Sequence, residues 1–438
     1  MVFTDAEVDQ SLIVEVVEFQ DIPDEEAAAF FFEDLAKMNG ATSFELQAAQ
    51  GLARAEAPLL PAGLYVAAAA GHQIVAKDHE ARGRPGADQA RHRIRLSHGT
   101  PTPLHPWALP GLPAGVEVHV KRDDLTGMLL SGNKARGDAR VRKLEFLLAD
   151  ALNGGHDSVI TIGGIQSNHA RATAVAARYV GLDSHLILRT SRAVVDKDPG
   201  LVGNLLVDRL VGAQLHLVTK EEYTRLGQHR LVQTLARELE AKGARPYAIP
   251  VGGSNAVGTW GYLAFAEELG AQIRGRGFTD IVLATGSGST AAGVALGNRL
   301  GGLGLRVHAY TVSDTEDYFY DAIDAILGEL WAQGDADARA LLRVRCAKGA
   351  GYAISSPDEL ATVRDVSAAT GVIMDPVYTG KALHGWLQDV RREPEAWRGR
   401  KVIFLHSGGL LGMYDKAGEL QGLVAGQGNV HRLQVDAA

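Results

Sequence analysis

A lysine in a turn-like run is the most chemically suggestive residue of this chain. Lys134 ends the run Ser131-Gly132-Asn133-Lys134, which follows the charged segment 121–127. A lysine amine is a nucleophile that forms Schiff bases with carbonyl groups when its surroundings lower its pKa. Most lysines are solvated surface groups, so Lys134 alone proves little. Its interpretation depends on four other short segments.

A run rich in glycine and hydroxyl groups follows the apolar stretch 281–284. It reads Thr285-Gly286-Ser287-Gly288-Ser289-Thr290 and leads into an alanine-rich helix start. The backbone N–H groups, the hydroxyls and the positive end of the helix dipole together suit a single phosphate monoester. The run lacks the lysine of a P-loop and the spacing of a dinucleotide-binding turn. An ordinary tight strand-to-helix turn is the alternative interpretation.

A second polar loop, residues 162–169, also separates an expected strand from an expected helix. Ser167, Asn168 and His169 follow a pair of glycines. Free backbone N–H groups suit a carboxylate here, and Ser167 and Asn168 would face the same pocket. The alternative is a helix N-cap, for which Ser and Asn are favoured residues. A cap needs one such residue rather than a cluster, so we favour a ligand-binding role.

Tyrosines and further hydroxyl residues lie on turns in the last third of the chain. Tyr378 and Thr379 belong to the turn 375–381, Ser407 begins a Ser-Gly-Gly run after an expected strand, and Tyr352 follows a glycine. Ligand contacts in α/β folds lie where strands end. Taken alone, the turn 375–381 is better explained by a structural tyrosine. No set of residues in the sequence has the pattern of a metal site.

The elements that must position these residues alternate between strands and helices from residue 93 onward. Such alternation predicts parallel sheets covered by helices, an α/β fold. Several later strands are continuous apolar runs, as expected of strands buried on both faces. The expected strands are 116–120, 158–162, 185–188, 214–218, 246–250, 280–284, 306–311 and 401–406, and the expected helices are 141–152, 170–180, 231–242, 259–269 and 381–390.

Length, charge and composition limit the class of protein. The 438 residues suit two or three domains, and 46% hydrophobic residues allow a large core. A net charge of −8 without a long basic run argues against nucleic-acid binding. No apolar run approaches the roughly 20 residues of a membrane helix. The single cysteine, Cys346, cannot form an internal disulfide and favours a reducing compartment.

Residues 1–92 differ from the rest and are interpreted as an accessory N-terminal extension. A strand at 11–19 and a helix at 24–38 are expected in it. It is either packed on the core or on a partner subunit, or it is a loosely held arm. The first 36 residues contain no Lys or Arg, which fits neither a secretory signal nor a mitochondrial transit peptide. We therefore expect a cytoplasmic protein, with organellar targeting as the alternative.

Taken in order, these segments resemble the D-cysteine desulfhydrase / 1-aminocyclopropane-1-carboxylate (ACC) deaminase family. The resemblance covers about residues 93–423, and it implies a fold type II pyridoxal phosphate (PLP) enzyme, similar to tryptophan synthase β. Such an enzyme has two open twisted α/β domains with the active site between them. A large PLP-binding domain would comprise 93–145 and 254–438, and a small α/β domain 146–253. The matching stretches are 121–134, 142–146, 163–169, 250–255, 285–290, 375–381 and 407–409.

The resemblance also implies roles for the candidate residues. Lys134 would form the Schiff base with PLP and act as the catalytic base, with Ser167 and Tyr378 as further catalytic residues. Asn168 would hydrogen-bond the ring hydroxyl of the cofactor, and Thr379 with Ser407 would face its pyridine nitrogen. The phosphate would be held by Gly286, Ser287, Gly288, Ser289 and Thr290. The substrate would contact Ser167, Asn168, His169, Tyr352 and Tyr378.

Two positions separate the activities of this family. ACC deaminases have Glu after the Tyr of the Pro-Val-Tyr turn and Gln after Ser-Asn, whereas this chain has Thr379 and His169. The resemblance therefore implies β-elimination of D-cysteine to pyruvate, hydrogen sulfide and ammonia by a homodimer. The alternatives are an ACC deaminase or another fold type II lyase or racemase, a PLP-binding protein with little catalysis, and a nucleotide-binding α/β protein without PLP.

One departure from the family pattern lies beside Lys134. Residues 135–141 stand where a single residue is usual, which adds six residues. The insertion either forms a longer turn on the surface or displaces Lys134. Lys143 is the only nearby substitute, but its position in a helix-start motif favours a structural role.

Overall fold

The computed structural model describes residues 74–75, 93–94, 96, 101–125, 141–330, 337–425 and 430–433. All of them belong to Pro61–Ala438, one of the two units into which the chain divides. The strand expected at 11–19, the helix expected at 24–38, and Lys134 lie outside the described residues. Within the described part, every helix is too short or too polar to span a membrane.

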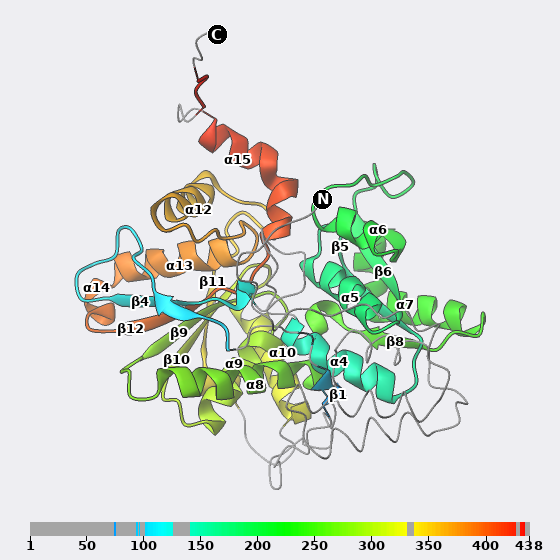
Figure 1. Cartoon of the computed structure of the whole chain (residues 1–438), viewed down its shortest axis with the longest axis horizontal. Helices are drawn as coiled ribbons and strands as arrows, with labels where there is room; N and C mark the ends of the chain where they lie inside the picture. The colour runs from blue at the N-terminus through cyan, green and yellow to red at the C-terminus, as the bar shows by residue number, and fades with distance from the viewer. Residues whose placement is uncertain are drawn as a thin grey trace, which may run out of the picture. The chain divides into compact units, whose positions relative to one another are not determined.

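The larger of the two main sheets has six strands in the order β11-β10-β9-β12-β4-β3 (Figure 1). Neighbouring strands are parallel, except that β3 runs antiparallel to β4. This arrangement confirms the predicted α/β fold. The edge strands β3 and β11 were not predicted, because three or four residues are too few to show a periodicity. The bounds are β3 Leu104–Pro106, β4 Glu117–Lys121, β9 Asp280–Thr285, β10 Arg306–Thr311, β11 Arg343–Cys346 and β12 Lys401–Leu405.

The second sheet has four parallel strands in the order β7-β6-β5-β8. All four come between β4 and β9 in the chain, so this sheet is inserted into the chain path of the larger one. Helix α7 packs on one face, where its leucines contact isoleucines of β5 and β6. Helices α5 and α6 pack on the other face. The bounds are β5 Ser158–Gly164, β6 Asp183–Thr190, β7 Gln214–Thr219 and β8 Pro246–Ile249.

Helices connect the parallel strands, and a short antiparallel pair, β1 (Ile74–Val75) with β2 (Arg93–Ile94), precedes both sheets. The α-helices are α4 Val141–Asn153, α5 Asn168–Tyr179, α6 Asn204–Leu210, α7 Lys220–Glu240, α8 Ala256–Ile273, α9 Ser289–Leu300, α10 Glu316–Leu330, α11 Ala338–Leu341, α12 Pro357–Thr370, α13 Thr379–Arg392, α14 Pro394–Trp397 and α15 Ala417–Val424. The 3-10 helices in the described residues are η4 Asp123–Leu125, η5 Val251–Gly253 and η6 Leu410–Lys416.

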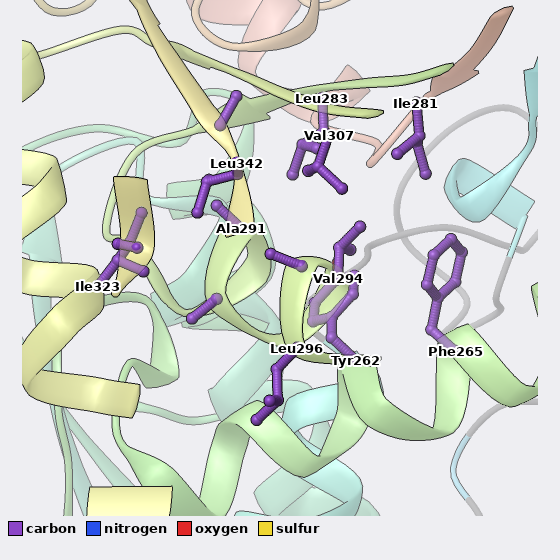
Figure 2. Close-up of a cluster of buried hydrophobic side chains, with 14 of the residues drawn as sticks. Tyr262, Phe265, Ile281, Leu283, Ala291, Val294, Leu296, Val307, Ile323 and Leu342 are labelled. Atoms are coloured by element: carbon purple, nitrogen blue, oxygen red, sulfur yellow. The ribbon is translucent and has the colours of Figure 1, made fainter. Parts of the chain in front are cut away.

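Strand β9 is buried on both faces of the larger sheet. Ile281 and Leu283 point into the cluster formed with α8, α9 and α10, which Figure 2 shows. Val282 and Ala284 belong to a second cluster with Trp386 of α13. Successive side chains of a strand point to opposite faces, so burial on both faces requires a continuous apolar run. The rigid core thus holds the C-terminal end of β9, where the predicted phosphate loop begins.

Candidate active site

A cavity of about 440 Å³ lies at the C-terminal ends of strands from both sheets. Its walls include segments that directly follow β5, β8, β9, β10 and β12. Open α/β sheets bind ligands at this edge, because the loops and helix N-termini converge there. The structure therefore brings together segments that are distant in the chain, from Lys143 to Gly409. The predicted site residues that line the cavity are Ser167, Asn168, His169, Gly286, Ser287, Thr290, Tyr352, Tyr378 and Ser407.

Hydroxyl groups from two loops form a cradle at the start of α9. Ser254 Oγ donates to Ser287 Oγ at 2.7 Å and lies 3.0 Å from Ser289 Oγ. Gly288 is the N-cap of α9 and has a positive φ of 93°, a conformation that favours glycine. Gly252 is also in the left-handed region, and a Cβ there would collide with the Ser287 hydroxyl. The cradle needs these two glycines, and its donor set suits a phosphate group.

A buried lysine lies beside this cradle. Lys143 of α4 is 2% exposed, lines the cavity, and donates from Nζ to the carbonyl oxygen of Gly252 at 3.0 Å. A cation at this place offsets the charge of a bound phosphate. The sequence suggested a structural role for Lys143, because its helix position alone does not reveal where the side chain points.

The loop after β5 supplies a capped helix start and two buried side chains. Ser167 Oγ accepts a hydrogen bond from Ala170 N at 3.1 Å, so Ser167 is the N-cap of α5 and also lines the cavity. Asn168 is 4% exposed, and its Oδ1 accepts from Asn204 Nδ2 at 2.9 Å. The cap that was weighed as the alternative interpretation is therefore present, alongside the cavity position.

His169 turns its Nε2 towards the strand behind it. Thr161 Oγ1 lies 3.1 Å from His169 Nε2 and donates its only proton to the carbonyl oxygen of Ile249 at 3.0 Å. His169 Nε2 must then be the donor to Thr161, which assigns the tautomer of the ring. The residue is 2% exposed and forms part of the cavity wall.

The two tyrosines of the site contact each other. Tyr352 Oη and Tyr378 Oη lie 2.7 Å apart, and the rings meet edge to face with centroids 6.0 Å apart. Ala353, next to Tyr352, has a φ of 59°, which is rare for a residue with a Cβ. The buried Lys381 supports this loop by donating to the carbonyl oxygen of Lys348 at 2.9 Å. The loop is thus held in a strained conformation that places one hydroxyl against the other.

Thr379 and Ser407 have different surroundings. Thr379 is fully buried, and its Oγ1 donates to Asp375 Oδ2 at 2.6 Å and accepts from Asp375 N at 3.1 Å. It does not line the cavity, whereas Ser407 does. Gly288, the N-cap of α9, and Ser289, its first residue, are not among the lining residues either.

Several residues of the cavity wall carry no recognisable signal in the sequence. Arg189 at the end of β6 stacks on Tyr223 of α7, with the guanidinium carbon 4.8 Å from the ring centre. Ser254 lies in a stretch that resembles the family but had no assigned role. Asn204, which lies behind the cavity wall, contacts Asn168 from 36 positions away in the chain and also carries no such signal. Long-range contacts of this kind leave no local pattern.

Comparisons with known proteins give two family matches that meet at residue 96. Residues 96–408 match the family described as pyridoxal-phosphate dependent enzyme. Residues 1–96 match the family described as Ran-interacting Mog1 protein. The longer match includes every residue that lines the cavity except Gly409.

Similar curated proteins extend over most of the chain. A bifunctional D-cysteine desulfhydrase/1-aminocyclopropane-1-carboxylate deaminase, mitochondrial, from Arabidopsis thaliana is 52% identical over 348 residues, 78% of this chain and 84% of that protein. A putative ACC deaminase from Thermotoga maritima is 37% identical over 70% of this chain and 93% of its own. A D-cysteine desulfhydrase from Salmonella choleraesuis is 35% identical over 71% of this chain and 92% of its own.

Solved structures share the fold. The crystal structure of an ACC deaminase homologue superposes with a TM-score of 0.65 at 30% identity, covering 84% of this chain and all of the other. An O-ureido-L-serine synthase superposes with a TM-score of 0.53 at 15% identity, covering 75% of this chain and 94% of the other, and indicates the fold only.

Proposed function

The chain belongs to the pyridoxal-phosphate dependent enzymes, and we propose that it is a carbon–sulfur lyase that acts on D-cysteine. The reaction is a β-elimination: D-cysteine and water give pyruvate, hydrogen sulfide and ammonia. The observation that carries this proposal is that a phosphate-type cradle, the Ser167-Asn168 loop and the tyrosine pair all line one cavity.

The donor set of the cavity fits the cofactor. Hydroxyls of Ser254 and Ser287 and the N-terminus of α9 would hold the phosphate, with Lys143 supplying positive charge nearby. Asn168 would donate to the ring oxygen. Ser407, which lines the cavity, would face the pyridine nitrogen. A hydroxyl there, rather than a carboxylate, leaves that nitrogen less strongly protonated.

The remaining residues would bind the substrate and move its protons. Bound PLP withdraws electrons from the Cα of the amino acid. Ser167 and the backbone N–H groups at the start of α5 would bind the substrate carboxylate. Lys134 Nζ would remove the Cα proton, since an amine desolvated beside a cation has a lowered pKa. Tyr378 Oη would donate a proton to the departing sulfur.

ACC deamination is the second candidate, because the Arabidopsis thaliana relative is named for both activities. The two reactions differ in the bond that breaks: a carbon–sulfur bond in D-cysteine, and a carbon–carbon bond of the ring in ACC. Thr379 and His169 favour the desulfhydrase. The Thr379 hydroxyl is hydrogen-bonded to Asp375, and the His169 imidazole is hydrogen-bonded to Thr161. Neither position therefore supplies the carboxylic acid that ACC deaminases have after the tyrosine.

A direct comparison of products tests the function. Purified protein is examined by absorbance for bound PLP, then given D-cysteine with sulfide trapped, or ACC with 2-oxobutyrate measured. We expect sulfide and pyruvate in equal amounts from D-cysteine and much less 2-oxobutyrate from ACC. A colourless protein, or a yellow protein that releases neither product, would contradict the proposal.

The domain division, assembly and compartment are part of the same proposal. Residues 1–92 form an accessory module, 93–145 with 254–438 the PLP-binding domain, and 146–253 the small domain. The separate family match of residues 1–96 supports the first of these boundaries. A homodimer is proposed and is tested by light scattering. The acidic first 36 residues favour the cytoplasm, whereas the name of the Arabidopsis thaliana relative says mitochondrial, and fractionation decides between them.

A further inference from the structure

A network of hydrogen-bonded side-chain amides extends from the cavity wall to helix α6, which packs on the second sheet. Asn204, the first residue of α6, is fully buried and contacts three residues of the loop after β5 and of α5. Its Nδ2 donates to Asn168 Oδ1 at 2.9 Å and to the carbonyl oxygen of Gln166 at 3.0 Å. Its Oδ1 accepts from Arg171 Nε at 3.2 Å.

The orientation of the Asn204 amide follows from its partners alone. Arg171 Nε can only donate a hydrogen bond, and the Gln166 carbonyl can only accept one. The oxygen of Asn204 must therefore face Arg171, and its nitrogen must face Gln166 and Asn168. No choice between the two amide atoms of Asn204 remains open.

This orientation dictates what Asn168 offers to a ligand. The Oδ1 of Asn168 accepts from Asn204, so its amide nitrogen is the group left for a molecule in the cavity. In the described part of the chain, no atom accepts a hydrogen bond from Asn168 Nδ2. Asn168 therefore acts towards the cavity as a donor, which suits an anionic or hydroxyl oxygen.

The backbone around Asn204 is built to hold it there. Gly203 has a φ of 60°, and a Cβ on it would lie 2.9 Å from the carbonyl oxygen of Leu411. Asn204 N donates to Gln166 Oε1 at 3.0 Å, and Gln166 Nε2 donates to the carbonyl oxygen of Val202 at 2.9 Å. Two loops are thus joined on both sides of Asn204, which leaves its side chain little freedom.

We propose that Asn204 is a positioning residue, which holds Asn168 with its amide nitrogen available to donate to the ring oxygen of the cofactor. This inference rests on the proposed function, because it needs PLP in the cavity. Asn204 does not touch the cofactor itself. Its effect passes entirely through the direction of the Asn168 amide.

The test replaces the Asn204 amide with a carboxylate. In Asn204→Asp the side chain keeps its size and pairs with Arg171, but it has no N–H for Asn168. Asn168 would then rotate to donate to the carboxylate and present its oxygen to the cofactor oxygen. Full-length protein is stripped of cofactor with hydroxylamine and titrated with PLP, without substrate, while the visible absorbance is followed.

We expect the Kd for PLP to rise about tenfold or more in Asn204→Asp, as for a lost hydrogen bond to a charged oxygen. The pH dependence of the visible band should also shift, because the ring oxygen loses its donor. The matched control is Asn298→Asp: Asn298 also donates and accepts hydrogen bonds, with Leu305, but it lies outside the cavity wall. That variant should bind PLP as the wild type does.

A double-mutant cycle separates positioning from damage to the fold. In an Asn168→Ala background the substitution of Asn204 should change the Kd little further, since its effect passes through Asn168. An equal rise in Kd with and without Asn168 would overturn the inference, and so would a folded Asn204→Asp with the Kd and spectrum of the wild type. Wild-type protein that binds no PLP would instead overturn the proposed function, and this inference with it.

Discussion

Arg142 and Asp123 form a buried bidentate salt bridge that joins the two described ends of the segment containing Lys134. Arg142 Nε donates to Asp123 Oδ2 at 2.9 Å, and Nη2 donates to Oδ1 at 3.0 Å. Asp123 precedes residues 126–140 and Arg142 follows them, and both side chains are at most 1% exposed. The separation of the two ends is therefore set by this pair and not by the length of the inserted segment.

Breaking the pair should destabilise the protein strongly. Asp123→Ala leaves the buried Arg142 guanidinium with Glu268 as its one remaining carboxylate partner among the described residues, and breaking a buried ion pair in this way costs about 3–5 kcal/mol of unfolding free energy. Urea unfolding measures the loss. The control, Asp317→Ala, removes the partner of Arg339 in an exposed pair and should leave stability unchanged. Equal losses in the two variants would contradict the importance of the buried pair.

Glu268 should make stability depend on pH in acid. Burial alone would raise the pKa of Glu268, but Arg142 and Lys121 lower it to about 2, from an ordinary value of 4.5. A depressed folded-state pKa contributes stability that is complete above about pH 4.5 and is lost as the pH falls towards 2. Glu268→Gln should therefore be less stable at pH 7, by on the order of 3 kcal/mol.

The difference between wild type and Glu268→Gln should shrink as the pH falls from 4.5 to 2. Chemical unfolding at a series of pH values measures it. A difference that stays constant from pH 7 to pH 3 would show that the carboxylate charge is not the cause.

The fold was predictable because its central strands leave strong local patterns. Ile281, Val282 and Leu283 form an unbroken apolar run, since β9 is covered on both faces. The two polar loops, 162–169 and 285–290, were predictable as well, because each lies between an apolar strand and the start of a helix. Strands β3 and β11 were missed at the sheet edges, where few residues are buried and the runs are short.

Side-chain partners within the site were not predictable. The hydroxyl of Thr379 donates to Asp375. Lys143, for which the sequence favoured a structural role at a helix start, lines the cavity. Asn204 comes from a seven-residue helix with no motif. These contacts arise from tertiary packing between distant segments, and the periodicity of a sequence records only which face is buried.

Two lysine substitutions should separate covalent attachment of the cofactor from electrostatic support. Lys134→Ala should lose the visible absorption of bound PLP and release no sulfide from D-cysteine. Lys143→Ala should keep the colour but bind PLP about tenfold more weakly, because a charge-assisted interaction near the phosphate is lost. If Lys134→Ala keeps both colour and activity, the assignment of Lys134 is wrong.

The tyrosine pair should act unequally in catalysis. Tyr378 and Tyr352 share a hydrogen bond of 2.7 Å, but only Tyr378 is assigned to protonate the departing sulfur. Tyr378→Phe should lower kcat for D-cysteine about a hundredfold, which is the lower end of the effect of removing a general acid. Tyr352→Phe should lower kcat less. The control substrate is 3-chloro-D-alanine, whose chloride leaves without a proton, so Tyr378→Phe should turn it over almost normally. An equal loss of kcat with both substrates would mean that Tyr378 shapes the cavity and does not protonate the sulfur.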